Sequence, residues 1–234
     1  MSNYDEKNTM WRVWSAEQIK DLMSRRAMYS ANEERARELD ELWVSQPEHQ
    51  KTAAFGRNYG YYVGLDEIRN YYVARHEDRI QSANGVGCME CHPVCSPYVQ
   101  LAEDGMSARG LWYSIGQETY PDSDGQPHGL WVNDKIAADF LLEEGGWKIW
   151  HLVLSNDVWH EAGTPITEMP DKLPEEMDLV RKEFGTPTIS MEVHNPLYLW
   201  CDNYPTIPPR YQTMNAENSY GPEGHPNYRK EAQV

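Results

Sequence analysis

The first third of the chain carries apolar side chains at the spacing of amphipathic helices. They recur every three or four positions, at Ile19, Leu22, Met23 and Ala27. That spacing places them on one face of a helix with 3.6 residues per turn. Ser15 followed by Gln18 has the form of a capping box, so we expect this helix to cover about residues 16–29. Further helices are expected over about residues 33–42 and from residue 64 onward.

The middle of the chain has the period of β-strands, in which successive side chains point to opposite faces. We expect strands over residues 98–102, 107–115, 131–142 and 147–155. Alternation through the last strand places on one face Trp147, Ile149, His151 and Val153. It places Asp139 on the outer face of the preceding strand. Three helices followed by a curved antiparallel sheet predict an α+β, cone-shaped fold with a cavity between the two layers.

The pattern dissolves after about residue 159. Residues 160–234 hold most of the prolines, and only residues 174–184 suggest a further helix. The run Leu197-Tyr198-Leu199-Trp200 is too apolar for a solvated tail. We therefore expect one domain over residues 1–159 and an extended C-terminal arm over residues 160–234 that covers the domain or a partner subunit.

Charge and composition narrow the function. The formal net charge of −16 argues against nucleic acid and anionic membrane surfaces, because phosphate binding needs clustered basic residues. No apolar run is long enough to span a bilayer and the N-terminus does not resemble a secretory signal, so we expect a cytoplasmic protein. The chain has 9 Trp and 15 Tyr against 3 Phe, which favours a pocket with polar edges over plain apolar packing.

Three of the four cysteines, Cys88, Cys91 and Cys95, lie within the string CMECHPVC. Cys88, Cys91 and His92 match the attachment string of c-type haem, and the cluster also offers thiolates for a metal. Haem attachment normally occurs in exported proteins, and a structural zinc site needs a second ligand pair. We therefore expect an ordinary loop of reduced thiols, with no metal, haem or other cofactor.

Several motifs together resemble the SnoaL-like branch of the nuclear transport factor 2-like superfamily. They are Gly64-Leu65-Asp66-Glu67-Ile68, His92-Pro93 with Ser96-Pro97, the strand from Glu103 to Trp112, and Ala138-Asp139-Phe140 with Gly146-Trp147-Lys148-Ile149-Trp150-His151-Leu152. The resemblance covers about residues 15–159. It implies a cone-shaped fold that is usually dimeric, in a group that includes polyketide cyclases, ketosteroid isomerases, scytalone-type dehydratases and a cofactor-free diarylpropane formaldehyde lyase. Other members only bind ligands, so the fold alone does not settle the function.

The chain has no P-loop, dinucleotide fingerprint, H-E-x-x-H or G-x-S-x-G motif, which leaves acid–base chemistry by side chains. His151 is the first candidate for the base, because strand alternation points it inward. Tyr29 stands where family enzymes keep a phenol that stabilises an oxyanion, and Arg26 lies in the apolar stripe of the same helix. His76 and His92 are further candidates for proton transfer.

Aromatic side chains are the candidates for binding the substrate: Trp112, Tyr72, Trp43, Tyr61 and Trp131. Small Ala108 and Gly110 are expected to leave room beside Trp112. Two functions follow. The first is a cofactor-independent lyase, dehydratase or isomerase for an aromatic or polycyclic molecule, with deformylation of a lignin-derived diarylpropane as its narrowest form. The second is a noncatalytic protein that binds a small molecule in the same cavity. Either is expected to be a homodimer.

Overall fold

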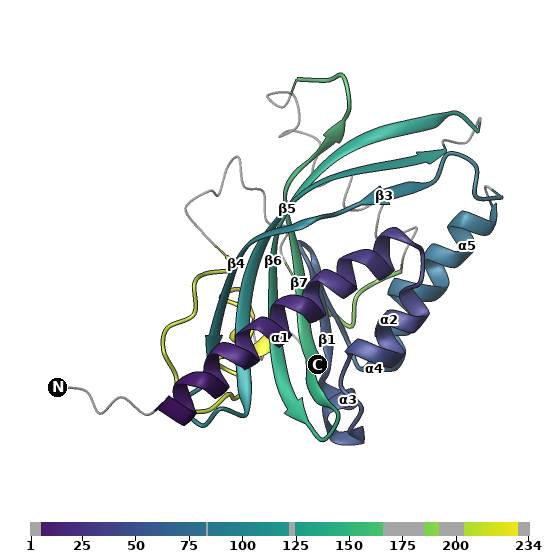
Figure 1. Ribbon diagram of the computed structural model, residues 1–234. Coiled ribbons are helices and arrows are strands. Elements are labelled where there is room, and N and C mark those ends of the chain that lie inside the picture. Colours follow the sequence, from purple (N-terminus) through teal and green to yellow (C-terminus); the bar gives the residue numbers. More distant parts are fainter. Residues whose placement is uncertain (1–5, 83, 122–124, 166–184, 192–203, 229–234) are drawn as a thin grey trace.

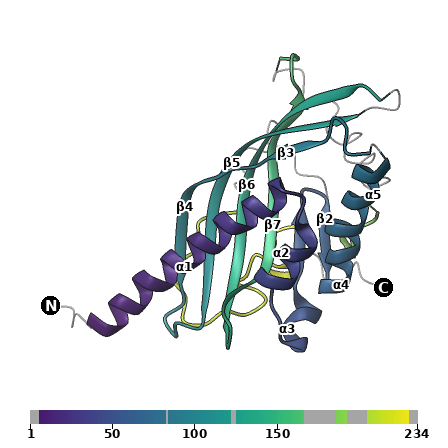
Figure 2. The same ribbon diagram turned by 45° about the vertical axis from the view of Figure 1, so that its right-hand side comes forward.

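Helices form the first layer of the computed structural model, which describes residues 6–82, 84–121, 125–165, 185–191 and 204–228. The elements are α1 (Glu6–Ala31), α2 (Arg35–Leu42), α3 (Pro47–Thr52), α4 (Leu65–Ile68), the π-helical η1 (Arg69–Ala74) and α5 (Arg75–Ser82). The last three continue into one another. Figures 1 and 2 show α1 crossing one face of the sheet, with α2, α4 and α5 beside it.

The second layer is a mostly antiparallel sheet. Its strands are β1 (Ala54–Arg57), β2 (Gly60–Val63), β3 (Met89–Cys91), β4 (Val94–Leu101), β5 (Ser107–Pro121), β6 (Pro127–Glu143), β7 (Gly146–Glu161) and β8 (Ile189–Ser190). The order is β3-β5-β6-β7-β1-β2-β8, with β4 also paired to β5. Strands β1 and β7 are parallel, and this pairing joins the short β1–β2 hairpin to the long strands. The expected α+β order of helices and curved sheet is confirmed.

The sheet buries side chains on both faces. On the helix side, Trp112, Phe140 and Ile149 pack with α1 and α2 in the larger core. On the other side, Ala137 and Val153 pack against Tyr220 of the C-terminal segment. We call residues 204–228 the arm, and this opposite face the arm side of the sheet. The arm, coloured yellow-green to yellow, lies on the side of the sheet away from α1 (Figures 1 and 2).

Two boundary predictions are wrong. Helix α1 begins at Glu6, so Ser15 is an interior helix residue that is fully buried and caps nothing. The polar segment between the two strands predicted over residues 107–115 and 131–142 is itself mostly strand, because β5 and β6 stay paired as far as Pro121 and Pro127. In both places the regular backbone hydrogen bonds continue through residues whose side chains alone predicted the end of the helix or strand.

The predicted face of His151 is also wrong, and a β-bulge is the reason. Ile149 pairs with Phe140, and His151 pairs with Asp139, so Trp150 is an extra residue in β7. One extra residue shifts the alternation of the following side chains to the other face. Ile149 therefore stays on the helix side, whereas His151 points to the arm side beside Asp139. The outward placement predicted for Asp139 is correct.

Main-chain and side-chain contacts hold the arm against the sheet. The backbone N–H of Tyr220 donates to Asp139 Oδ2 at 2.6 Å, and Glu103 N–H donates to the Tyr211 carbonyl at 3.0 Å. The Arg109 guanidinium lies 4.0 Å from the centre of the Tyr220 ring. This part of the chain covers its own domain, as one of the two expectations had it. The predicted helix over residues 174–184 and the run Leu197–Trp200 lie outside the described residues.

Candidate functional site

A buried set of polar side chains lies on the helix side of the sheet, where α1, α2 and η1 meet. Arg26 is only 2% exposed, and its Nη2 donates to the Tyr72 hydroxyl at 3.1 Å. Tyr72 in turn donates to Glu38 Oε2 at 2.7 Å, and Glu38 Oε1 lies 3.5 Å from Arg26 Nε. The Trp43 indole N–H donates to Glu38 from the end of α2 at 3.3 Å. The helices therefore supply a cation, a phenol and a carboxyl group in mutual contact.

Burial controls how these groups ionise. It raises the pKa of Tyr72 to about 12, so the phenol keeps its proton at neutral pH. It also raises the pKa of Glu38, an effect that Arg26 and the Tyr72 hydrogen bond oppose. For Arg26, burial lowers the pKa, but Tyr72 and Glu38 together raise it further, so the guanidinium stays charged. Arg26 and Tyr72 are thus buried donors. Arg26, which the sequence places in the apolar stripe of its helix, is on the buried face of α1.

A second group joins α2 and α5 to β3. Arg35 Nη2 and the Tyr120 hydroxyl both donate to Glu90, and His76 Nδ1 lies 3.5 Å from Glu90 Oε1. Burial would raise the pKa of Glu90, but Arg35 and His76 outweigh it and hold that pKa below its usual range. His76 therefore faces the helix side, next to an ionised carboxylate.

His92 lies between β3 and β4, between two carboxyl groups. Its Nε2 is 2.7 Å from Glu118 Oε1, and its Nδ1 is 3.8 Å from Asp134 Oδ2. Burial lowers the pKa of His92, but Glu118 and Asp134 outweigh it and raise the pKa above the usual value. Nδ1 is buried and makes no hydrogen bond to the described residues. The His92 ring fits here because residue 116 is glycine: a Cβ at that position would come within 2.4 Å of Nδ1.

Asp134, the second carboxyl group beside His92, is connected through hydrogen bonds to residues of β7 and β1. Asn156 donates from Nδ2 to Asp134 Oδ1, and Arg57 Nη2 donates to Asn156 Oδ1 at 3.0 Å. Burial raises the pKa of Asp134, while His92 and Arg57 lower it. We call the three neighbouring groups around Glu38, Glu90 and His92 the helix-side network; Arg35 lies 5.4 Å from the centre of the Tyr72 ring, between the first two.

Apolar side chains lie beside the network. Trp112 and Phe140 meet edge to face with ring centroids 6.0 Å apart, and both are buried. The Trp112 ring covers Gly110, where an added Cβ would come within 2.3 Å of it. The face predicted for Trp112 is confirmed, but its own ring fills the room expected above Gly110.

His151 belongs to a different place. Its Nδ1 is 2.8 Å from Asp139 Oδ2, and its Nε2 is 3.2 Å from the carbonyl oxygen of Thr52. Gly221 of the arm packs onto the ring, since a Cβ there would come within 2.6 Å of it. Both nitrogens therefore face acceptors, and the expectation that His151 points inward is wrong.

Three further candidates lie away from the helix-side network. The Tyr29 hydroxyl donates to Glu41 Oε2 at 2.6 Å, at the surface contact between α1 and α2. The Tyr61 hydroxyl is 2.8 Å from that of Tyr204, on the arm side. Trp131 is 38% exposed. Trp43, by contrast, is buried beside Glu38.

Sequence reasoning missed the acidic members of the network: Glu38, Glu90, Glu118 and Asp134. One signal was present, because Arg26 on an apolar helix stripe requires a buried partner. Strand parity also places Glu118 and Tyr120 on the face of Trp112. Cys88, Cys91 and Cys95 are free thiols, and the described residues hold no group of three or more His, Cys, Asp or Glu side chains placed to bind a metal.

Comparison with known proteins gives the family and the fold. The family model described as the SnoaL-like domain matches residues 11–153. A hexachlorocyclohexane dehydrochlorinase, LinA-type3 from Novosphingobium barchaimii LL02, superposes with a TM-score of 0.50 at 12% identity, over 67% of this chain and 96% of that chain. A protein from Novosphingobium aromaticivorans named for scytalone dehydratase superposes with a TM-score of 0.50 at 10% identity, over 67% and 93%.

These identities support the nuclear transport factor 2-like fold and nothing finer. A search of curated proteins found no match to the chain. Among the described helices, none has the length and apolar character needed to cross a membrane.

Proposed function

We propose that this chain, which belongs to the SnoaL-like domain family, is a cofactor-independent acid–base enzyme of the lyase class that acts on a small aromatic molecule. The observation that carries the proposal is the helix-side network. It brings a histidine paired with a carboxylate, two buried arginines and a protonated phenol to one side of one sheet. Perturbed, buried ionisable groups of this kind concentrate at functional sites.

His92 is the proposed base. Glu118 accepts a hydrogen bond at Nε2, so the proton of the neutral ring is held there and the lone pair is on Nδ1. That atom makes no hydrogen bond to the described residues, and it is the atom that would take a proton from the substrate. The electron pair of the broken bond to hydrogen forms a double bond as the leaving group departs, which is an elimination. The proton stays on His92, which becomes its conjugate acid, and the leaving group departs with the electron pair of its own bond. Proton and charge therefore balance.

Arg26 and Tyr72 are the proposed donors to the oxyanion or departing group. Both are buried and both keep their protons at neutral pH, and Tyr72 would turn to the substrate the single O–H that it otherwise donates to Glu38. Fixed donors in a site without bulk water stabilise developing negative charge strongly. Trp112 and Phe140 supply apolar surface for an aromatic substrate. His76, beside Glu90, is the second candidate for proton transfer.

The narrowest form of the proposal is deformylation of a lignin-derived diarylpropane. Its support is the resemblance of the hairpin motifs, together with the aromatic surface beside the network. In that reaction His92 would remove the proton of a terminal hydroxyl, and the adjacent carbon–carbon bond would break to release formaldehyde. Its electron pair would form a carbon–carbon double bond as a second hydroxyl on the neighbouring carbon leaves as water, protonated by the Tyr72 phenol. Isomerisation and dehydration need the same base and the same oxyanion donors, so the network serves them equally well.

A noncatalytic ligand-binding protein is the alternative. It is favoured by the extent of ion pairing inside the network, since Arg26 and Arg35 each already have a carboxylate partner. Paired groups of this type also occur as structural elements of a core.

The experiment is a screen of phenolic and diarylpropane compounds with the purified chain. Formaldehyde release and exchange of substrate C–H for deuterium are the two readouts, and His92→Gln is the matched variant. The proposal expects turnover or exchange in the wild type and its loss in the variant. Saturable binding with neither readout would support the alternative, and equal rates in both proteins would remove His92 from the reaction.

We also propose that the chain forms a homodimer through uncovered strand positions next to the arm. On β5, Tyr113 is 51% exposed and Ile115 is 64% exposed, and Trp131 of β6 is 38% exposed. Exposed apolar groups this close together favour a protein contact. Light scattering of the wild type and of Ile115→Lys checks it, and a monomeric mass for the wild type would refute it.

A further inference from the structure

A buried serine hydroxyl lies on the helix side of the sheet, on β5. Ser114 comes two residues after Trp112 and two before Gly116, so all three face the same side of the strand. Ser114 is only 1% exposed, and its hydroxyl is buried without a hydrogen bond to the described residues. Buried polar groups are nearly always hydrogen-bonded, so this hydroxyl indicates a bound water or a ligand.

Ser114 lies beside the proposed base. It is directly opposite Asp134 in the pairing of β5 with β6. Opposed side chains on one face of a sheet have Cβ atoms about 4.5–5.5 Å apart. Asp134 Oδ2 is in turn 3.8 Å from His92 Nδ1, and the His92 ring lies over Gly116, the next position on this face of β5. Two groups without a hydrogen bond to the described residues, Ser114 Oγ and His92 Nδ1, therefore border the same carboxyl group.

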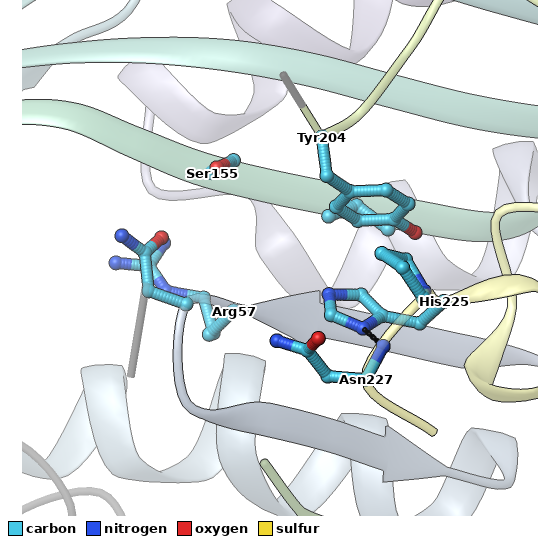
Figure 3. Close-up of a pocket in the computed structure, with 8 residues that line it drawn as sticks. Arg57, Ser155, Tyr204, His225 and Asn227 are labelled. Carbon is cyan, nitrogen blue, oxygen red and sulfur yellow. Dashed lines mark hydrogen bonds between the residues drawn. The ribbon is translucent and has the colours of Figure 1, made fainter. Parts of the chain in front are cut away.

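Arg57 is the cation next to this carboxyl group. It also borders a pocket on the arm side, across from the rings of Tyr204 and His225 (Figure 3). Its Nη2 donates to Asn156, however, and Asn156 donates in turn to Asp134. The charge of Arg57 therefore lies with Asp134 on the helix side and not in the arm-side pocket.

An uncharged hydroxyl is the ligand group that matches these surroundings. It can accept a hydrogen bond from Ser114 and at the same time donate one to His92 Nδ1. A carboxylate has no proton to donate, and it would face Glu118 and Asp134 as like charges. An ammonium group has no lone pair to accept from Ser114, and it would compete with Arg57 for Asp134. A ketone accepts from Ser114 but has no proton for His92.

We propose that Ser114 contacts the substrate and makes the site specific for an uncharged alcohol. The inference rests on the proposed function, in the form in which His92 removes a hydroxyl proton. The Ser114 hydroxyl donates to the substrate oxygen, the proton of that oxygen passes to His92 Nδ1, and the aromatic part of the substrate lies against Trp112. Negative charge develops on the oxygen as the proton leaves, and a fixed donor beside it stabilises that charge. No bond of Ser114 is made or broken.

The alcohol 1-phenylethanol is the probe for this site. Its control is acetophenone, the corresponding ketone, which has nearly the same shape and no hydroxyl proton, and benzoate and benzylammonium test the effect of charge. Titration calorimetry of the full chain should give saturable binding of 1-phenylethanol in the millimolar range. Acetophenone should bind about 5-fold more weakly, as the loss of one hydrogen bond implies, and both charged probes should bind more weakly than the alcohol. This comparison uses only wild-type protein, so it does not depend on whether a variant folds.

Ser114→Ala is the test variant, and Ser107→Ala is the matched control. Ser107 is on the same strand and is also buried, at 3% exposed, but it faces the arm side together with Arg109. Loss of the Ser114 hydroxyl should weaken the binding of 1-phenylethanol about 5-fold, and Ser107→Ala should bind it as the wild type does. Urea unfolding curves show whether each variant is folded.

Four results would overturn the proposal: no saturable binding of 1-phenylethanol up to about 20 mM, acetophenone binding as tightly as the alcohol, tighter binding of either charged probe, or unchanged affinity in a folded Ser114→Ala. The last result would mean that Ser114 binds only a water. None of these measurements needs turnover. The expected affinities without turnover of any compound would refute the proposed enzyme and keep the alcohol site, whereas turnover with unchanged affinity in Ser114→Ala would refute only the role of Ser114.

Discussion

The two faces of the sheet each hold a buried histidine against a carboxylate, and they differ in what the second ring nitrogen meets. On the helix side, His92 is 2.7 Å from Glu118, and its Nδ1 has no hydrogen-bond partner among the described residues. On the arm side, His151 is 2.8 Å from Asp139, and its Nε2 faces the Thr52 carbonyl. His92 has one ring nitrogen without a hydrogen bond to the described residues, the atom that the proposed reaction uses. His151 has both nitrogens engaged, and the arm packs onto its ring.

A histidine–carboxylate pair is therefore not by itself evidence of catalysis. The pair sets the tautomer and orientation of the ring in both places. Its use depends on the remaining nitrogen and on what covers the ring. The carboxylate Asp139 holds the arm as well as His151, since it also accepts from the Tyr220 backbone. The arm-side pair is therefore a docking point.

Removing each histidine in turn tests this comparison most strongly. His92→Gln should lower the turnover of the substrate found by screening by about 10²–10⁴-fold, the usual effect of losing a general base. His151→Gln, the matched variant on the other face, should keep turnover within a few-fold of the wild type. Single-turnover rates measure both. A larger loss for His151→Gln than for His92→Gln would reverse the assignment of the two faces.

The two faces of α1 provide a second contrast, in stability. Arg26→Met leaves Glu38 buried without its cation, and breaking a buried ion pair from one side costs about 3–5 kcal/mol. Arg25→Met, one residue away, removes an exposed pair with Glu41 and should cost at most about 1 kcal/mol. Urea unfolding curves give both free energies. Equal costs in the two variants would mean that Arg26 is not needed to balance Glu38.

Two tyrosines, one buried and one at the surface, should differ in their effect on the reaction. Tyr72→Phe removes the buried phenol donor and should lower turnover about 10²-fold, as for one oxyanion donor. Tyr29→Phe loses a hydrogen bond to Glu41 at the surface and should leave turnover unchanged. Substrate affinity should change little in either, because the rings remain. If Tyr29→Phe is the slower enzyme, the donor is at the α1–α2 contact instead.

Sequence patterns predicted the layers well and the site only in part. Helices and strands could be predicted because each buries one stripe or one face, and this repeats apolar residues along the chain at a regular spacing. Arg26, Tyr72, His76 and His92 were candidates for the site, and the structure places all four on the helix side. The prediction for the face of His151 failed for a local reason. Trp150 is one extra residue in its strand, and the alternation of side chains does not reveal such a bulge until the pairing partner of His151, Asp139, is known.

The acidic partners could not be found for a related reason. Glu38, Glu90 and Glu118 come from three elements and are joined only by the fold, so their spacing in the chain holds no information about their distance. Their residue type normally indicates exposure. Only Arg26, on the apolar stripe of its helix, indicated that a buried carboxylate must be near it. The sequence did not identify which carboxylate that is.

The dependence on pH gives the finest test of the helix-side histidine. Folding raises the pKa of His92 above its unfolded value of about 6.5, despite burial, because Glu118 and Asp134 face the ring. The stability that His92 contributes is then fully present below about pH 6.5 and is lost as pH rises through the folded pKa, by up to about 1.4 kcal/mol for each pKa unit. The free energy of unfolding of the wild type minus that of His92→Gln should therefore fall over this range.

A base must lose its proton to work, so kcat/KM should rise over the same range. Urea titrations and rates measured from about pH 5 to pH 9 would show the two curves crossing. A stability difference that grows with pH would mean that folding lowers the pKa of His92, and a rate that stays flat would mean that another group takes the proton.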